Sequence, residues 1–553
     1  MKGTRNRAEP QWPVRLASHA SIEPRVDDVG PWIVALDGVP RARISQDVAS
    51  VLKELDGERD AGQIALTLGA PWTASDVGSV VEQLAPTGIF DAGSRRNAPR
   101  RVQFRAPLTV QLTLFDPSSV LPALHPVVTF LLRRGSLALL AISLLGGLLV
   151  VSSTGTDIVR LFSSPLPFAT YLGVAAAMFA STLLHELGHG LALSYFGGKP
   201  RRIGIMLFYL SPAFFCDVTD GWRLASRKQR VMVALAGPLV HVGLGSLALC
   251  GQAFMATSPL KDGLLLYGVL CYTVALLNLF PFIKLDGYVA LMSALDIPHL
   301  RRKSLAAAEE IVGRFALGTT VKVPRPGFLA LFGLASFAAG IFFVVVGFQR
   351  LVPVFLQFGM AGHAAVALLI GLLAILAVKG IVRFFRTAAA NGSTLWRRTL
   401  ALLLGVGLTS AVLATVPVSS VQVAGYSLEA GQLSIVFPKD SKLPSIEAGD
   451  RVSLQTQGTV VHTELGLATV SSLPPSETNA PPESIAPVTL PGITVPVIAY
   501  DAEIRAAHAD LPAHGRAEVT SNVKTTLGEY LWAAVTSSPL WPGNIGNAEK
   551  ENR

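Results

Sequence analysis

Long apolar runs separated by short polar segments dominate the chain after about residue 135. Each run is close to the roughly 20 residues that an α-helix needs to cross a bilayer. The pattern therefore predicts an α-helical polytopic membrane protein with about seven spans embedded in the lipid bilayer. The predicted spans cover residues 136–154, 168–190, 231–256, 264–284, 327–348, 364–382 and 399–418.

The composition agrees with this pattern. Of 553 residues, 50% are hydrophobic and 15% are charged, whereas soluble domains carry about 25% charged residues. An ordinary soluble enzyme is therefore excluded. The formal net charge is +9, but the basic residues lie in patches between the apolar runs, so we expect no nucleic-acid partner. The three cysteines, Cys216, Cys250 and Cys271, match no metal-knuckle spacing and provide no disulfide framework.

The basic patches predict an orientation. Arginine and lysine are abundant before the first span and in the loops after the second, fourth and sixth spans, whereas the alternate loops hold only Arg160, Lys261 and Arg350. Basic loops remain cytoplasmic. We expect a multi-pass protein of a bacterial-type cell (plasma) membrane, with its N-terminus cytoplasmic and its C-terminal domain outside. No apolar run near Met1 resembles a signal peptide.

Residues 20–92 predict a small α/β domain of winged-helix type. Residues 32–36 read as a strand that enters a turn at Asp37-Gly38. Ser45 is expected to cap a first helix, a second helix covers about 60–68, and Ser75 is expected to open a third. The weak net charge of this segment argues against DNA binding.

The regions flanking the spans predict less regular structure. Residues 93–135 are rich in arginine and read as an irregular basic linker along the cytoplasmic membrane surface. The tail, residues 420–553, has strand-like runs such as 432–437 and 451–454, and a Pro/Ser/Thr-rich stretch at about 473–497 interrupts them. We expect a small extracytoplasmic β domain, which leaves residues 136–419 as the transmembrane core.

The second span ends in a pattern that carries chemistry, His185-Glu186-Leu187-Gly188-His189. Residues four apart lie on one face of a helix, so both imidazoles can bind one zinc ion while Glu186 lies beside them. Polar groups at membrane depth are costly and indicate function. The alternatives are a polar contact between helices or a degenerate site.

A catalytic zinc site usually has three protein ligands. The best candidate for the third is Asp286, which follows the fourth span at the predicted cytoplasmic side, where the second span also ends. An Asp-Gly pair is common in turns, so Asp286 alone would be a weak signal for a metal ligand. Its occurrence together with the two histidines, on the same predicted side of the membrane, makes the assignment specific.

These paired motifs resemble the site-2 protease family of intramembrane zinc metalloproteases over about residues 165–300. The resemblance implies that His185, His189 and Asp286 bind Zn²⁺, that Glu186 is the general base, and that Asn278 holds substrate or the oxyanion. The family often carries asparagine after an Ala-Gly-Pro on the intervening span. Here His241 takes that place, either as a substrate contact or as a helix-packing residue.

Two further features adjoin this motif. Residues 203–210 read either as a membrane-inserted β segment that offers an edge to an extended substrate, or as a re-entrant packing element. Cys216 and Asp217 are secondary candidates for metal ligands.

Residues 22–92 resemble a PqqD-like precursor-peptide recognition domain, of the pyrroloquinoline-quinone peptide chaperone type. The pattern includes Leu55-Asp56-Gly57, Leu68-Gly69 and Gly88-Ile89-Phe90. This resemblance implies capture of a leader peptide by strand addition.

The leading hypothesis is an intramembrane zinc endopeptidase that removes the leader from a ribosomally synthesised precursor peptide. The alternatives are a regulatory protease that cuts a membrane-bound regulator, and a non-catalytic membrane protein that binds or exports peptides. The oligomeric state and the peptide's identity stay open.

Overall fold

The protein is described by a computed structural model. It covers residues 12–24, 32–36, 39–90, 102–105, 109–208, 211–224, 226–320, 327–356, 359–439, 446–471, 474–526 and 528–529. Contacts divide the chain into two compact units. The first holds residues 1–150, 175–254 and 267–298, and the second holds residues 151–174, 255–266 and 299–553.

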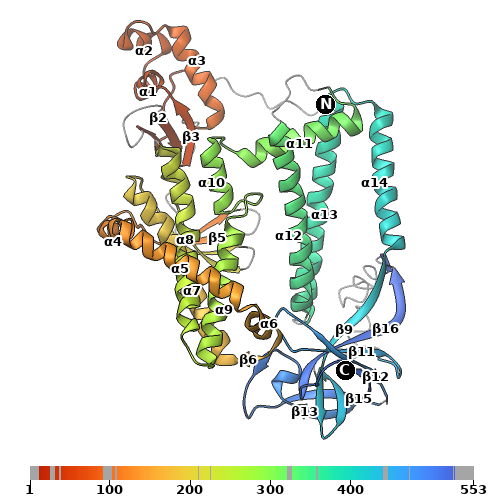
Figure 1. The fold of residues 1–553 in the computed structure, drawn as a ribbon. Helices are drawn as coiled ribbons and strands as arrows, with labels where there is room; N and C mark the ends of the chain where they lie inside the picture. Colours follow the sequence, from red (N-terminus) through yellow and green to blue (C-terminus); the bar gives the residue numbers. More distant parts are fainter. Residues whose placement is uncertain are drawn as a thin grey trace, which may run out of the picture. The chain divides into compact units, whose positions relative to one another are not determined.

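The first unit begins with a small α/β domain (Figure 1). Strands β1 (Ala20–Glu23), β2 (Trp32–Leu36) and β3 (Val39–Ile44) form an antiparallel sheet in that order. Leu36 pairs with Val39, so the predicted hairpin is confirmed, although its turn residues 37–38 lie outside the described residues. The helices that follow are α1 (Gln46–Lys53), α2 (Ala61–Leu68), α3 (Ala74–Leu84) and the short η1 (Ala85–Thr87).

The helix starts follow local capping chemistry. Ser45 accepts the backbone N–H of Val48 and caps α1, as predicted. The third helix begins earlier than the sequence suggested, because Thr73 and not Ser75 is its cap. Thr73 accepts the N–H of Asp76 while the Asp76 carboxylate accepts the N–H of Thr73, a reciprocal capping box.

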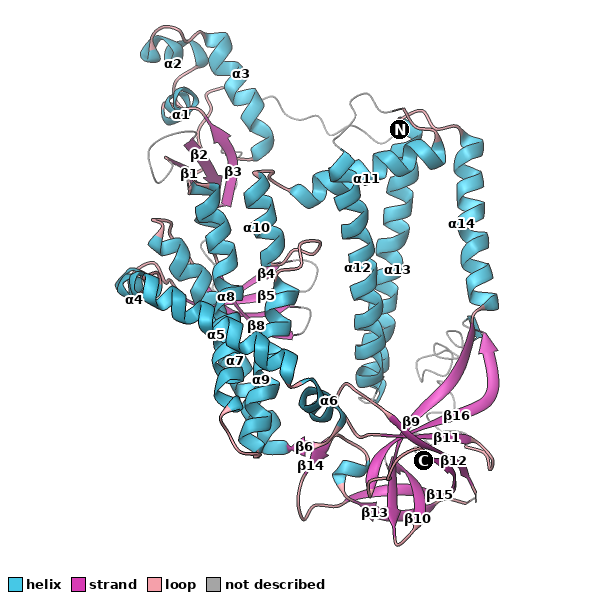
Figure 2. Ribbon diagram, viewed as in Figure 1, coloured by secondary structure: helices cyan, strands magenta, loops and turns pink. Residues whose placement is uncertain are grey.

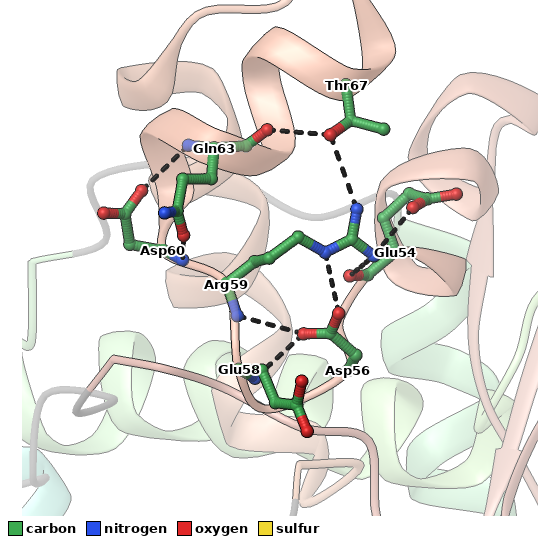
Figure 3. A network of polar contacts seen from close by, with 7 residues as sticks. All are labelled: Glu54, Asp56, Glu58, Arg59, Asp60, Gln63 and Thr67. Atoms are coloured by element: carbon green, nitrogen blue, oxygen red, sulfur yellow. Dashed lines mark hydrogen bonds and ion pairs between the residues drawn. The ribbon is translucent and has the colours of Figure 1, made fainter.

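A polar network fixes the turn between α1 and α2 (Figure 3). The Arg59 guanidinium donates to Asp56 at 2.7 Å and to Glu54 at 2.9 Å. Backbone N–H groups of Glu58 and Arg59 also donate to Asp56, and these bonds, with the Arg59 side chain, lower the pKa of Asp56 to about 2. The carboxylate is therefore charged at neutral pH and keeps the turn closed.

The predicted linker contributes two strands to a second antiparallel sheet. Its order is β4 (Val102–Arg105), β5 (Thr109–Phe115), β7 (Ile203–Phe208) and β8 (Ser211–Cys216). The prediction that residues 93–135 are irregular is thus wrong for β4 and β5, while residues 91–101 lie outside the described residues. Residues 109–114 alternate polar and apolar side chains, the two-residue period of a strand. The prediction missed this short pattern because it was based on the arginine-rich composition of the whole segment. The short helices η2 (Leu121–Leu124) and α4 (His125–Leu131) follow.

Seven helices of the described chain are long and apolar enough to cross a membrane by length and composition, which confirms the predicted number. They are α5 (Arg134–Ser153), α7 (Phe168–Tyr195), α8 (Arg227–Ala253), α9 (Pro259–Asn278), α12 (Gly327–Leu356), α13 (Gly359–Ala390) and α14 (Leu395–Thr415). The remaining elements among them are α6 (Gly155–Ser163), β6 (Leu166–Pro167), η3 (Thr219–Arg223), α10 (Asp286–Leu295) and α11 (Leu300–Leu317).

The chain after α9 corrects one expectation. The fourth span, predicted to reach residue 284, ends at Asn278, and Asp286 begins the separate helix α10. Pro281 has no backbone N–H and disfavours helical geometry in the residue before it, which favours a helix end in this segment. A β-carbon at Gly287 would overlap the Leu279 backbone, so the return of the chain to α10 needs glycine.

The second unit ends in a β domain, as predicted (Figure 2). Its strands are β9 (Pro417–Glu429), β10 (Gln432–Pro438), β11 (Arg451–Gln455), β12 (Glu464–Val470), β13 (Ser476–Ala480), β15 (Val495–Ala507) and β16 (His514–Thr526). The sheet order is β10-β9-β16-β11-β12-β15-β13, and pairing of β10 with β15 closes it into a barrel. Tyr426, Ile435 and Val452 lie in its core. The predicted strands at 432–437 and 451–454 are confirmed, and η4 (Pro482–Ser484) and β14 (Val488–Thr489) occupy the proline-rich stretch.

Candidate metal centre

Helix α7 brings two histidines to one point. His185 and His189 lie one turn apart, and both residues are 5% exposed. Their Nε2 atoms are 3.2 Å apart. The helical period that predicted a shared face is therefore matched by the side-chain geometry.

The N-terminal residue of α10 completes a three-residue cluster. Asp286 Oδ2 lies 3.1 Å from His185 Nε2, and Oδ1 lies 3.4 Å from His189 Nε2. The ligand atoms of the three residues lie within 4.8 Å of one another. Oδ2 also has no hydrogen-bond partner. The structure thus brings together all three residues that the sequence proposed as ligands, from helices about 100 residues apart.

The donor separations fit a tetrahedral ion. Two ligand atoms at the usual zinc distances of about 2.0–2.1 Å, at a tetrahedral angle, are about 3.3–3.4 Å apart. The two Nε2 atoms are 3.2 Å apart, and they lie 3.1 and 3.4 Å from the two different oxygens of Asp286, which are separations of this size. Two imidazoles and one carboxylate are also a donor set that zinc accepts, and they leave a fourth position for water.

The other nitrogen of each imidazole is held by a second partner. His189 Nδ1 lies 2.7 Å from the Val233 carbonyl, which can only accept, so Nδ1–H donates and Nε2 is left to bind a metal. His185 Nδ1 lies 2.9 Å from His241 Nδ1. When His185 Nδ1–H donates there, its Nε2 also faces the cluster as a lone pair. Such partners orient metal ligands.

His241, which the sequence left either as a polar contact or as a helix-packing residue, lies beside His185. It is 1% exposed and lies against the Nδ1 edge of His185, whereas Asp286 faces the Nε2 edge. It is also absent from the side chains that line the cavity beside the cluster. Its position suits a group that orients His185.

Helix α8 leaves room for an ion by carrying a glycine. A β-carbon at Gly237 would lie 2.6 Å from His185 Nε2 and would overlap His189 Nε2. Sequence reasoning used Ala236-Gly237-Pro238 only as a marker for position 241 and missed this role. The signal available was a glycine within an apolar helix, which often marks a close approach.

Glu186 lies beside the cluster and faces a cavity. Its Oε2 accepts the backbone N–H of Cys216 at 2.8 Å. The cavity, of about 160 Å³, is lined by Glu186, His189 and Asp286, and by residues of η3, α8 and α10 that include Trp222, Arg230 and Ser293. A carboxylate with one oxygen held by the backbone keeps a fixed orientation toward this space.

The strand next to Glu186 is at a sheet edge. Of the two alternatives for residues 203–210, the structure shows a strand, β7, over 203–208, but β7 lies between β5 and β8 and does not offer the edge. In the described sheet the edge belongs to β8, whose last residue, Cys216, is the one bonded to Glu186. Residues 209–210 lie outside the described residues.

The remaining candidates fall outside the cluster. Asp217 pairs with Arg202 at 3.0 Å and accepts from Thr219, and these contacts outweigh burial and lower its pKa. Cys216 contributes its backbone N–H, and the hydrogen bonds of the described residues include none between the Asn278 side chain and the cluster. Asn278 is the last residue of α9, directly before Leu279, which packs on Gly287.

Parts of this chain are similar in sequence to three known proteins. A Bacillus subtilis protein named "Putative peptide zinc metalloprotease protein YydH" is 30% identical over 122 residues, which are 22% of this chain and 46% of that protein. A Synechocystis protein named "Putative zinc metalloprotease sll0528" is 28% identical over 193 residues, 34% of this chain and 49% of that protein. The Mycobacterium tuberculosis "Putative zinc metalloprotease Rip2" is 29% identical over 183 residues, 28% of this chain and 68% of that protein.

The chain thus spans about half the length of the first two relatives. No protein-family model matches it, and no solved structure matches it. The similarity is therefore to proteins named as zinc metalloproteases.

The role of Gly237 gives a direct test of the site. We expect Gly237→Ala to abolish stoichiometric metal binding, because the added carbon takes the space between the two imidazoles. Gly251→Ala on the same helix is the matched control, since no atom lies within 4 Å of its β-carbon. The test measures the metal content of both purified proteins by inductively coupled plasma mass spectrometry. Equal metal in both variants would contradict the placement of the ion.

Proposed function

We propose that this chain is a zinc-dependent endopeptidase that works within a membrane, of the site-2 protease type. One observation carries the proposal: two histidines and an aspartate form one cluster among helices apolar enough to span a bilayer, and an adjacent glutamate lines the same cavity as His189 and Asp286. Such groups are costly in that setting unless they serve a function.

In the proposed hydrolysis of a peptide bond, the zinc ion and the side chains have different roles. When bound, zinc supplies Lewis acidity, which polarises a peptide carbonyl and acidifies a water molecule. His185, His189 and Asp286 would hold it, and His241 and the Val233 carbonyl contact the Nδ1 edges of the two imidazoles and orient them. Glu186 accepts the proton of the attacking water at Oε1, because Oε2 accepts from Cys216, and then returns it to the leaving amine.

The edge strand β8 suits an extended substrate. A peptide bond inside a helix is shielded by its own hydrogen bonds, so a membrane-embedded substrate must unwind before cleavage. An exposed strand edge can accept the unwound segment by main-chain pairing. Since β8 ends at the residue that holds Glu186, a peptide added along it would run toward the proposed base.

The substrate we propose is a ribosomally synthesised precursor peptide whose leader is removed. The support is the N-terminal domain, a three-stranded sheet with edges at β1 and β3 and three helices, which has its own core. An α/β domain with an open strand edge suits capture of a leader by strand addition, in a winged-helix manner. The relative YydH is named a "Putative peptide zinc metalloprotease protein", and a peptide substrate for this chain agrees with that name.

The proposed base has a clean test. Glu186→Gln should retain zinc and lose peptide cleavage by at least about a hundredfold, because it removes the proton acceptor and no ligand. His185→Ala should lose both. The readouts are metal content and cleavage of a labelled precursor peptide in detergent. Undiminished cleavage by the Glu186→Gln protein would rule out this mechanism, and wild-type protein without zinc would rule out the function.

The proposed substrate class has a separate test. A synthetic leader peptide added in trans should compete with the precursor, raising its KM while leaving kcat unchanged, because both occupy the N-terminal domain. A scrambled leader of the same composition is the control. If the leader does not compete and the enzyme instead cuts a single-span membrane regulator, the regulatory alternative is correct.

The proposed orientation can be measured with reporters. We expect a reporter fused after residue 92 to be active in the cytoplasm and one fused after residue 420 to be active outside. The reason is the concentration of arginine and lysine in alternate loops. Paired alkaline phosphatase and fluorescent protein fusions report the two sides. Both fusions active on the same side would contradict an odd number of spans.

A further inference from the structure

Helix α10 connects the metal centre to a second polar cluster. It has ten residues, begins with Asp286 and is followed by its C-terminal cap, Asp296. Asp296 adopts φ 54°, in the left-handed region that residues other than glycine adopt at a cost. Asparagine and aspartate tolerate that conformation better than other side chains apart from glycine. The cap position therefore permits aspartate here but does not require its charge.

The Asp296 carboxylate meets three arginines. Arg230 on α8 lies 2.8 Å away, Arg227 at the start of α8 lies 3.6 Å away, and Arg43 on β3 lies 3.4 Å away. Burial opposes ionisation, but Arg43, Arg230 and Arg227 together outweigh it and lower the pKa of Asp296. The carboxylate is therefore charged at neutral pH, and it joins the N-terminal domain to the helix of the metal ligand.

Two of the arginines that contact Asp296 also contact a residue that lines the cavity beside the metal centre. The Trp222 ring is approached by the Arg43 guanidinium at 5.6 Å and by the Arg230 guanidinium at 5.9 Å from its centroid. Trp222 and Arg230 both line the cavity that Glu186, His189 and Asp286 share. A second ion pair, Glu23 with Arg223 at 2.8 Å, joins strand β1 to η3.

We propose that Arg43 is a positioning residue: by holding Asp296 it fixes α10, and with it the metal-binding carboxylate of Asp286. The inference rests on the proposed zinc function. A ten-residue helix is a rigid rod of about 15 Å, so a shift at one end moves the other. The N-terminal domain is then part of the metal centre's support as well as a recruiter of peptide.

Three variants test this proposal in the full-length protein. Arg43→Ala removes the contact from the N-terminal domain. Asp296→Asn removes the charge but keeps a side chain that tolerates the left-handed cap. Arg41→Ala is the matched control, since it removes the same charge from the same strand and the described ion pairs do not include Arg41.

The readouts separate positioning from recruitment. We expect Arg43→Ala to release zinc to a chelator about two- to fivefold faster, in keeping with the strength of a partly exposed ion pair. It should also speed amide exchange across Asp286–Leu295 and lower kcat on a leader-free peptide without changing KM. Asp296→Asn should act at least as strongly, and the double variant should not be additive, because both changes break one contact.

The outcomes are decisive. If Arg43→Ala matches Arg41→Ala in zinc release and exchange, the proposal is wrong. If Asp296→Asn alone changes them, the arginines of α8 hold α10 and the N-terminal domain does not. Wild-type protein without peptidase activity would contradict the proposed function, yet zinc release and amide exchange would still decide whether Arg43 supports α10.

Discussion

The structure depends on satisfying polar groups that are buried among apolar helices. Two imidazoles and a carboxylate in such surroundings are unfavourable unless each atom has a partner. The chain meets this constraint directly at the Nδ1 edges, which contact the Val233 carbonyl and His241. The Nε2 edges and the Asp286 carboxylate face one another as acceptors, and a bound metal ion would satisfy them together. The arrangement of α7, α8 and α10 follows from these contacts, because each helix supplies one part of the set.

This constraint explains which residues the sequence could predict. His185 and His189 follow from the helical period alone, since two ligands one turn apart must share a face. Asp286 could be proposed from its position after an apolar run, but its place at the start of α10 depends on Pro281 and on the close approach of Gly287 to Leu279. Pro281 is a local signal that the length of the predicted span overlooked, whereas the approach of Gly287 to Leu279 is a contact of the folded chain that hydrophobic periodicity does not predict.

Other features could not be predicted because they involve distant segments. Gly237 matters through the imidazoles of another helix, and His241 acquires its partner only when α7 and α8 pack together. Likewise β7 was identifiable as a strand, yet its interior position depends on β5, almost 100 residues earlier. The N-terminal hairpin and the strands at 432–437 and 451–454, in contrast, were predicted from local pattern and turns, whereas the other strands of the barrel were not assigned from the sequence.

The central claim is that two imidazoles and one carboxylate, without sulfur, hold zinc in this chain. X-ray absorption at the zinc edge of the purified full-length protein measures this directly. We predict nitrogen and oxygen scatterers at about 2.0–2.1 Å, with an imidazole signature from two histidines and no sulfur. A sulfur scatterer at about 2.3 Å would contradict the account, because it would place a cysteine such as Cys216 on the ion in place of the Asp286 carboxylate.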